Sequence, residues 1–223
     1  MGGIQNSHTK ITTLLFFAVS LADVAAVGMK LSLLEMICKP LLMISLLLLY
    51  LSACRQRDAW YMAALLFSFL GDVFLLDKQG MFLYGVASFL LAQLLYVRIV
   101  SREIKVHNWK GRILSGLPFA IYLYLLITLL RPNLGAFMAP VLVYGLAISL
   151  FGTVSLMHYL AKPDRDSAIL LAGALLFILS DSMIALNKFH GEKNFYPVSI
   201  MVTYLAAQYL IFRFMARKCL SKA

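Results

Sequence analysis

Two aspartates inside long apolar segments are the residues in this sequence most able to do chemistry. Asp72 follows Gly71 and Asp181 follows Ser180, each within a run of hydrophobic residues. A charge inside a bilayer is costly, so an intramembrane carboxylate usually faces a partner or a water-filled cavity. Two carboxyl groups that share such a site tend to hold one proton between them, which suits acid and base catalysis at neutral pH. The sequence therefore predicts Asp72 and Asp181 as catalytic residues of a site within the membrane.

The composition requires lipid around the elements that carry these aspartates. With 62% hydrophobic residues, 13% charged residues and a mean hydropathy of +0.86, the 223-residue chain has too little polar surface for a water-soluble globule. A membrane crossing needs roughly 20 apolar residues, so about eight helices would use nearly the whole chain. The sequence predicts an all-α, polytopic membrane protein, an eight-helix transmembrane bundle forming a single domain over residues 1–223. The expected helices cover residues 11–29, 32–53, 59–76, 81–100, 113–130, 137–160, 167–186 and 195–214.

The basic residues give the expected orientation. The formal charge of +10 comes from 20 Lys and Arg against 10 Asp and Glu, and in a soluble protein it would suggest nucleic acid. Basic residues also collect at the cytoplasmic ends of membrane helices, and most of those in this chain fall in connections on the side that holds both chain ends. Both termini are therefore expected in the cytoplasm, with no nucleic-acid partner. The expected location is a bacterial inner membrane.

Four more polar residues are expected near the two aspartates. Counted at about 1.5 Å per residue, Lys39 and Asp23 reach the same level in the outer half of the membrane, while Gln93 and Gln208 lie nearer the cytoplasm. A shared polar pocket would explain this, because each buried charge needs another to offset its desolvation. Two other interpretations stay open: the glutamines bridge helices by hydrogen bonds, and Lys39 pairs with an aspartate.

An internal repeat is suggested by two pairs of helices. Residues 88–98 and 203–213 share Leu, Ala, Gln, Leu and Arg at the same spacing, and the small residue before Asp72 recurs before Asp181. Copies separated by an even number of crossings run in the same direction, which gives a pseudo-twofold axis along the membrane normal. A 4+4 pseudo-repeat would place Asp72 and Asp181 opposite each other. Chance similarity between Leu-rich segments is the alternative.

Neither a metal nor another cofactor is predicted. The three cysteines form no spaced metal or redox motif. A zinc hydrolase would need histidines and carboxylates at one depth, but the histidines fall in the tail, the connections or the helix ends, at His8, His107, His158 and His190. No serine stands in a G-x-S-x-G turn, so covalent esterase chemistry has little support.

The sequence resembles the YhhN-type lysoplasmalogenase family of membrane hydrolases over nearly its whole length. The resemblance rests on Lys39-Pro40, on residues 71–75, on Gly85, Phe89 and Tyr96, and on residues 173–177, 180–182 and 187–189. The two aspartate motifs are its most specific part. One departure is Gln93, where many members carry His, so the resemblance gives Gln93 no essential role in proton transfer.

This resemblance implies hydrolysis of the vinyl ether bond of a lysoplasmalogen to a fatty aldehyde and glycerophosphoethanolamine or glycerophosphocholine. One aspartic acid would protonate the alkenyl carbon and the other carboxylate would activate water, without a metal. The implied partners are the lysoplasmalogen substrate and membrane lipids, and the oligomeric state stays open. The residues expected to bind substrate are Lys39, Asn187, Tyr96, Gln93, Gln208 and Tyr204.

Two other classes of function fit the same pattern. A proton-coupled transporter also carries repeats and carboxylates near the middle of the membrane. It would move solute or protons and release no aldehyde. A structural or signalling membrane protein would tolerate neutral replacements of Asp72 or Asp181.

Overall fold

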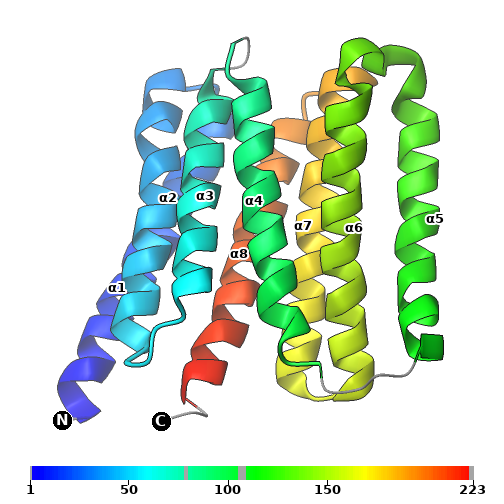
Figure 1. The fold of residues 1–223 in the computed structure, drawn as a ribbon. Helices are drawn as coiled ribbons and strands as arrows, with labels where there is room; N and C mark the ends of the chain where they lie inside the picture. Colours follow the sequence, from blue (N-terminus) through cyan, green and yellow to red (C-terminus); the bar gives the residue numbers. More distant parts are fainter. Residues whose placement is uncertain (1, 78–79, 105–108, 221–223) are drawn as a thin grey trace. The chain divides into compact units, whose positions relative to one another are not determined.

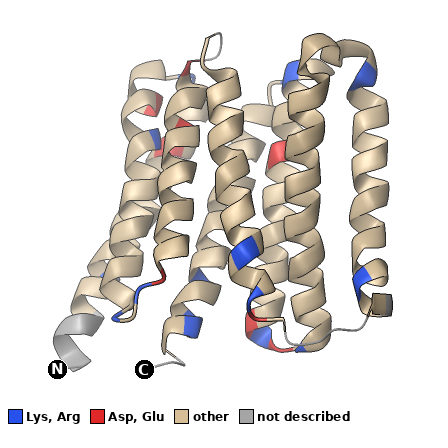
Figure 2. Cartoon of the chain, viewed as in Figure 1, with Lys and Arg blue, Asp and Glu red and all other residues tan. Residues whose placement is uncertain are grey.

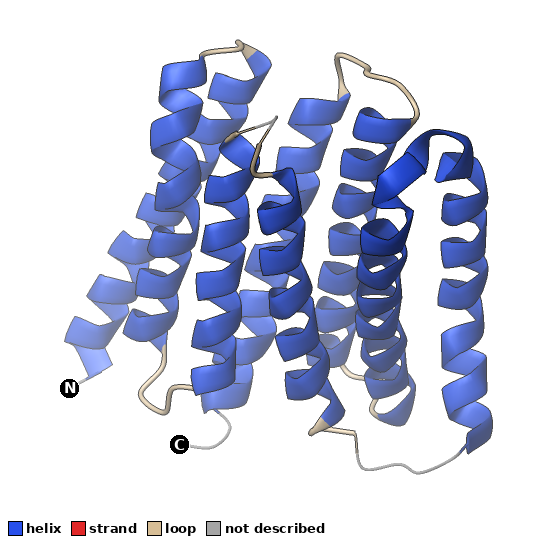
Figure 3. Cartoon of the chain, turned by 45° about the horizontal axis from the view of Figure 1, so that its top comes forward, coloured by secondary structure: helices blue, strands red, loops and turns tan. Residues whose placement is uncertain are grey.

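The described part of the chain is helical throughout. The computed structural model describes residues 2–77, 80–104 and 109–220, and every regular element in those ranges is a helix, joined to the next by a short connection (Figures 1 and 3). The predicted all-α class is confirmed. The helices are α1 (Gly2–Gly28), α2 (Ser32–Ala53), α3 (Ala59–Leu76), α4 (Phe82–Ser101), α5 (Trp109–Leu134), α6 (Met138–Ala161), α7 (Arg165–Phe189) and α8 (Tyr196–Leu220), with the 3₁₀ turn η1 (Gly135–Phe137) between α5 and α6.

The helix ends differ from the predicted ones mainly at the two ends of the chain. The helix predicted at 11–29 begins at Gly2, and the helix predicted at 195–214 continues to Leu220. Both extensions consist of residues more polar than the apolar runs they continue. Hydropathy marks where a helix lies in lipid, whereas backbone hydrogen bonding carries the helix on into water, so the apolar run gives only the membrane-embedded part.

Seven helical stretches of the described chain are long and apolar enough to cross a membrane. One of them, Gly111–Ala161, is a 51-residue run that comprises η1, α6 and all of α5 but its first two residues. At 1.5 Å per residue it would extend about 75 Å, more than twice the roughly 30 Å of the hydrocarbon core. Figure 1 shows α5 and α6 as antiparallel neighbours joined at the turn, where Gly135 has a φ of 48°. These helices indicate a multi-pass membrane protein.

Apolar side chains also cover outward-facing helix surfaces. Along α5, Ile113, Leu117 and Tyr124 are 61%, 54% and 70% exposed. Water would penalise such a surface, but lipid does not. Figure 2 shows the charged residues mostly at helix ends, with few along the middle of the helices. The distribution of polarity therefore fits helices that are solvated by lipid.

The chain packs as two compact units, Met1–Ala92 with Phe212–Ala223, and Gln93–Ile211. In the first unit α1 packs along α2, and α2 packs against α3. Glycine permits a close approach of α3 and α4: a Cβ added to Gly71 would lie 2.6 Å from the Phe89 ring, and one added to Gly85 would lie 3.4 Å from the Gly71 carbonyl oxygen. Side chains larger than hydrogen would separate these two helices.

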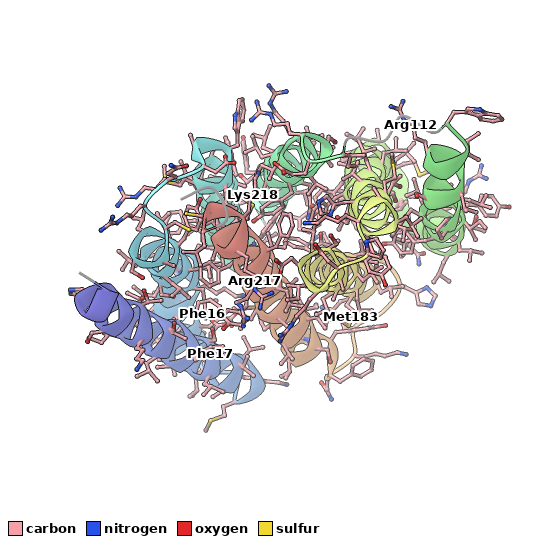
Figure 4. The ribbon with its side chains drawn as sticks, turned by 90° about the horizontal axis from the view of Figure 1, so that it is seen from below. Phe16, Phe17, Arg112, Met183, Arg217 and Lys218 are labelled. Carbon is pink, nitrogen blue, oxygen red and sulfur yellow. The ribbon has the colours of Figure 1, made fainter. Side chains whose placement is uncertain are left out.

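The connection between α2 and α3, which is expected on the cytoplasmic side, also contacts the end of α8. The Asp58 side chain caps α3 by accepting hydrogen bonds from the backbone N–H groups of Trp60 and Tyr61, at 3.0 and 3.4 Å. Lys218 of α8 lies 3.7 Å from the same carboxylate, and Figure 4 shows Lys218 and Arg217 on that helix. The Asp58 carboxylate therefore joins the start of α3 to the end of α8.

In the second unit α5 packs on α6, and α6 packs on α7. Glycine again sets the helix spacing, because a Cβ at Gly152 would lie 2.3 Å from the Phe119 ring and 2.8 Å from Ile178. The Asp164 side chain begins α7 by accepting a hydrogen bond from the Ser167 N–H at 2.8 Å. These contacts position the middle of α7, where one of the predicted catalytic residues lies.

Candidate functional site

Asp181 of α7 accepts a hydrogen bond from a tyrosine on the neighbouring helix. The Tyr144 phenol of α6 donates to Asp181 Oδ2. Asp181 itself is half-buried, so it is shielded without being closed off. A phenol that donates to a carboxylate fixes its orientation and offsets part of its desolvation, while the second carboxylate oxygen stays available to another molecule. The sequence reasoning identified Asp181 but missed Tyr144.

A second tyrosine extends this polar group. The hydroxyls of Tyr122 and Ser182 lie 2.7 Å apart, and Ser182 also donates to the Ile178 carbonyl at 2.6 Å. A serine hydroxyl has one proton to donate, so Tyr122 must be the donor to Ser182. Ser182 directly follows Asp181, and the two tyrosines therefore approach adjacent residues of α7 from α5 and α6.

Gln93 lies beside the Tyr144 phenol in the same unit. Its side chain is 0% exposed and lies close enough to the Tyr144 hydroxyl to interact with it. A buried amide has more donor and acceptor capacity than this one neighbour can use, so it is a candidate contact for a bound molecule or water. The predicted substrate-binding role of Gln93 stays a prediction, now with a location next to Asp181's hydrogen-bond donor.

Asp72 lies on α3 in the first unit, next to the close approach of α3 and α4. The residue is 6% exposed, and its neighbour Gly71 contacts Phe89 and lies near Gly85. Asp72 and Asp181 belong to different compact units, so their convergence at one site stays a prediction.

Lys39 forms its ion pair within its own helix. Its Nζ contacts Glu35 Oε1 one turn earlier on α2, and the two side chains are 14% and 19% exposed. The sequence had left open the interpretation that Lys39 pairs with an aspartate. The i,i+4 spacing of Glu35 and Lys39 was the available signal for this pair. Asp23 of α1 is fully buried and lies close enough for the charges of both groups to act on it.

Three of the predicted substrate-binding residues bond to one another. The Tyr96 hydroxyl donates to Gln208 Oε1 at 2.9 Å, and Gln208 Nε2 donates to the Tyr204 hydroxyl at 3.3 Å. All three are at most 4% exposed, and both tyrosine rings pack against Phe177. These hydrogen bonds join α4 to α8, which for Gln208 is the bridging interpretation that the sequence had left open. Asn187 lies half-buried near the end of α7.

No group of three or more His, Cys, Asp or Glu side chains that could hold a metal ion occurs in residues 2–77, 80–104 and 109–220. The polar atoms gathered around Asp181 are instead phenol, serine and amide groups. Such an arrangement can orient a carboxylate and a small polar molecule.

The chain is similar to several proteins that are named lysoplasmalogenases. It is 37% identical over 154 residues to the lysoplasmalogenase TMEM86A of Bos taurus, covering 66% of this chain and 61% of that protein. It is 33% identical over 175 residues to the lysoplasmalogenase TMEM86B of Sus scrofa, covering 78% and 71%. A lysoplasmalogenase of Mycobacterium bovis is 30% identical over 162 residues, covering 70% and 60%. The chain thus spans about three-fifths of the length of the TMEM86A and mycobacterial relatives.

No solved structure matches the chain. The YhhN family matches it over residues 34–215, which contain α3, α6 and α7 and therefore both predicted catalytic aspartates and Tyr144. This match covers most of the sequence, and the chain belongs to the YhhN family.

Proposed function

We propose that this protein is a lysoplasmalogenase, which hydrolyses the sn-1 vinyl ether bond of a lysoplasmalogen to a fatty aldehyde and glycerophosphoethanolamine or glycerophosphocholine. The observation that carries the proposal is the intramembrane carboxylate of Asp181, oriented by Tyr144, in a chain whose relatives are named lysoplasmalogenases. A vinyl ether needs an acid strong enough to protonate carbon and a base that activates water. Carboxyl groups supply both without a redox cofactor.

The proposed reaction begins with proton transfer from Asp72 to the second carbon of the alkenyl chain. The double bond supplies the electron pair, and an oxocarbenium ion forms at the first carbon. Asp181 stabilises this cation and takes a proton from the attacking water, so that a hemiacetal forms. The hemiacetal releases the aldehyde and the glycerol hydroxyl, and one water is consumed in total. This use of two carboxyl groups resembles glycoside hydrolysis.

The roles follow from the hydrogen bond at Asp181. A carboxylate that accepts a hydrogen bond from a phenol at one oxygen is suited to act as the base, because its other oxygen can accept the proton from water. We assign the acid role to Asp72, which is buried beside Gly71. In this assignment Gln93 and Asn187 contact water or the glycerol portion, and Tyr96, Tyr204 and Gln208 hold α4 to α8 near the site.

The proposed architecture is one transmembrane domain with eight crossings, a 4+4 pseudo-repeat and both termini in the cytoplasm. The repeat is supported by contacts at equivalent sequence positions, one within each unit. Gly71, before Asp72, approaches Gly85, whereas Ser180, before Asp181, donates its hydroxyl to the Ile200 carbonyl at 3.0 Å. Gly85 and Ile200 stand the same number of residues before Gln93 and Gln208. The run of residues 111–161 is too long for one crossing, which supports the count of eight.

The test compares alkenyl and acyl lysophospholipids of the same chain length with purified protein. The proposal predicts aldehyde from the alkenyl lipid and no fatty acid from the acyl lipid. In D₂O the aldehyde should gain one deuterium at its second carbon, because that carbon is protonated. Absence of aldehyde, with lipid-dependent proton or solute flux in proteoliposomes, would instead support the transporter interpretation.

A further inference from the structure

A cluster of three charged residues joins α1 and α2. Glu35 and Lys39 form an ion pair on one face of α2, and Asp23 on α1 interacts electrostatically with both. Two carboxylates thus surround one ammonium, which leaves a surplus of negative charge if all three are ionised. Asp23 lies outside residues 34–215, so the YhhN family match does not include it.

Asp23 is the unsatisfied member of this cluster. The residue is 0% exposed, and neither carboxylate oxygen has a hydrogen-bond partner. Ser20, one turn earlier on α1, is also buried, and its hydroxyl has no partner. A buried carboxylate without a partner costs several kcal/mol. The charge of Lys39 acts on Asp23, but Glu35 already holds this ammonium, so a second cation at Glu35 would free Lys39 to pair with Asp23 as well.

The cluster lies near the ends of α1 and α2 that meet at their connection. At 1.5 Å per residue, Asp23 stands about 8 Å before the end of α1, while Glu35 and Lys39 stand about 5 and 10 Å after the start of α2. A long charged side chain this close to a helix end can extend toward the membrane interface, where the lipid headgroups lie. The Glu35 and Lys39 side chains are 19% and 14% exposed, so both are accessible to a ligand.

We propose that Glu35, Lys39 and Asp23 form the binding site for a phosphoethanolamine headgroup. The primary ammonium binds Glu35, the phosphate binds Lys39, and Asp23 becomes the carboxylate partner of Lys39 when Glu35 turns to the ligand. Carboxylates suit a primary ammonium, which donates hydrogen bonds, whereas a quaternary ammonium has no N–H and is typically held by aromatic rings. The inference rests on the proposed lysoplasmalogenase function and specifies its preferred substrate class as the ethanolamine lipid.

The test measures binding of three saturated-ether lysolipids to the purified full chain: the phosphoethanolamine lipid, the phosphocholine lipid and the lipid that ends in phosphate. The wild type should bind the ethanolamine lipid most tightly. Glu35→Gln should weaken that binding about tenfold and leave the affinity for the phosphate lipid unchanged. Asp23→Asn should weaken binding of the ethanolamine lipid less than Glu35→Gln does. Lys39→Met should weaken binding of all three lipids.

Glu192→Gln is the matched control, because it makes the same change at an exposed glutamate between α7 and α8. Equal binding of the three lipids by the wild type would overturn the inference without any variant. So would a Glu35→Gln protein that loses affinity for the phosphate lipid and the ethanolamine lipid to the same extent. Free glycerophosphoethanolamine, added as a competitor, shows whether the headgroup alone binds or the lipid chain is required.

Saturated ethers separate this inference from the proposed function. They lack the vinyl group, so their binding does not depend on hydrolysis. An ethanolamine preference without aldehyde release from any alkenyl lipid would contradict the proposed function alone. Aldehyde release without a headgroup preference would contradict the Glu35, Lys39 and Asp23 site alone.

Discussion

The expected role of Asp181 as a base depends on a hydrogen bond from a side chain on another helix. Tyr144 stands on α6, far from Asp181 in the sequence, and donates to one of its oxygens. Residue type alone predicted the two aspartates, because a carboxylate in an apolar run is expensive and usually functional. Residue type could not predict Tyr144, since tyrosines are common in membrane helices and the contact depends on how α6 and α7 pack. Glu35 was missed although its spacing from Lys39 was readable.

Removal of the Tyr144 hydroxyl should slow catalysis more than binding. Hydrogen bonds to charged groups contribute about 1.5–3 kcal/mol, so Tyr144→Phe should lower kcat by about 10- to 100-fold with little change in KM. Steady-state aldehyde release measures both constants. Tyr124→Phe, at an exposed tyrosine of α5, is the control.

The double variant Tyr144→Phe with Asp181→Asn tests whether the two residues act together. Its loss of rate should be smaller than the two single losses combined, because the asparagine has already removed the charge that Tyr144 contacts. Fully additive losses, or a Tyr144→Phe protein with wild-type kcat, would contradict the positioning role of Tyr144.

At the scale of helices, apolar runs predicted which parts of the chain are embedded in lipid. Capping residues determine where the helices begin, and glycines determine how closely neighbouring helices approach. The predicted start of α7 was residue 167, whereas the helix begins at Arg165 because Asp164 caps it. The close approach at Gly71 could be suspected from a small residue, but its partner Phe89 could not be assigned without the structure. Helix packing depends on side-chain fit between distant segments, which hydropathy does not record.

Gly71→Ala should disturb the contact of α3 with α4. The added Cβ would lie 2.6 Å from the buried Phe89 ring, and overpacking of this kind costs about 1–3 kcal/mol. Thermal unfolding in detergent should show a lower midpoint. Displacement of the helix beside Asp72 should also lower the rate of aldehyde release. Gly111→Ala is the control, because nothing lies within 4 Å of its added Cβ. An unchanged midpoint for Gly71→Ala would mean that α3 and α4 are less closely packed.

Asp164→Ala should destabilise α7 in a pH-dependent way. The Lys162 ammonium, and then the Ser167 N–H, lower the pKa of Asp164 below its ordinary value. The carboxylate therefore contributes stability above about pH 3.9, its pKa in an unfolded chain, and this contribution is lost as the pH falls through the lower folded value. Loss of the cap should cost about 1 kcal/mol at pH 7.

The check is the thermal midpoint of wild type, Asp164→Ala and Asp164→Asn at pH 7 and in acid. Asparagine should retain most of the stability, because its side-chain oxygen can still cap the helix. The difference between wild type and Asp164→Ala should shrink below pH 4. A difference that grows in acid would contradict the lowered pKa of Asp164.

For the whole molecule, the sequence predicted the membrane class securely, because a mean hydropathy of +0.86 leaves few alternatives. The reversal between α5 and α6 was predicted from Arg131, Pro132 and Asn133, although the backbone is helical throughout residues 111–161. The family match to residues 34–215 extends over seven of the helices and leaves α1 outside it. How the two compact units meet depends on contacts that neither periodicity nor composition encodes.

Eight crossings require both chain ends on the same side of the membrane. Green fluorescent protein folds in the cytoplasm, so fusions at either terminus should fluoresce, and alkaline phosphatase fusions at the same positions should be inactive. The basic residues near the end of α8 support a cytoplasmic location. Fluorescence from one terminus only would mean an odd number of crossings and would contradict the pseudo-repeat.

The most direct test of the central claim is single-turnover aldehyde release from an alkenyl lysophosphatidylethanolamine by folded Asp72→Asn and Asp181→Asn proteins. Both variants should lose activity by about 100- to 10,000-fold, the usual contribution of a general acid or base. Asp166→Asn, in the first turn of α7, serves as the control and should react at the wild-type rate. Wild-type turnover by either the Asp72 or the Asp181 variant would contradict a reaction carried by the two intramembrane aspartates.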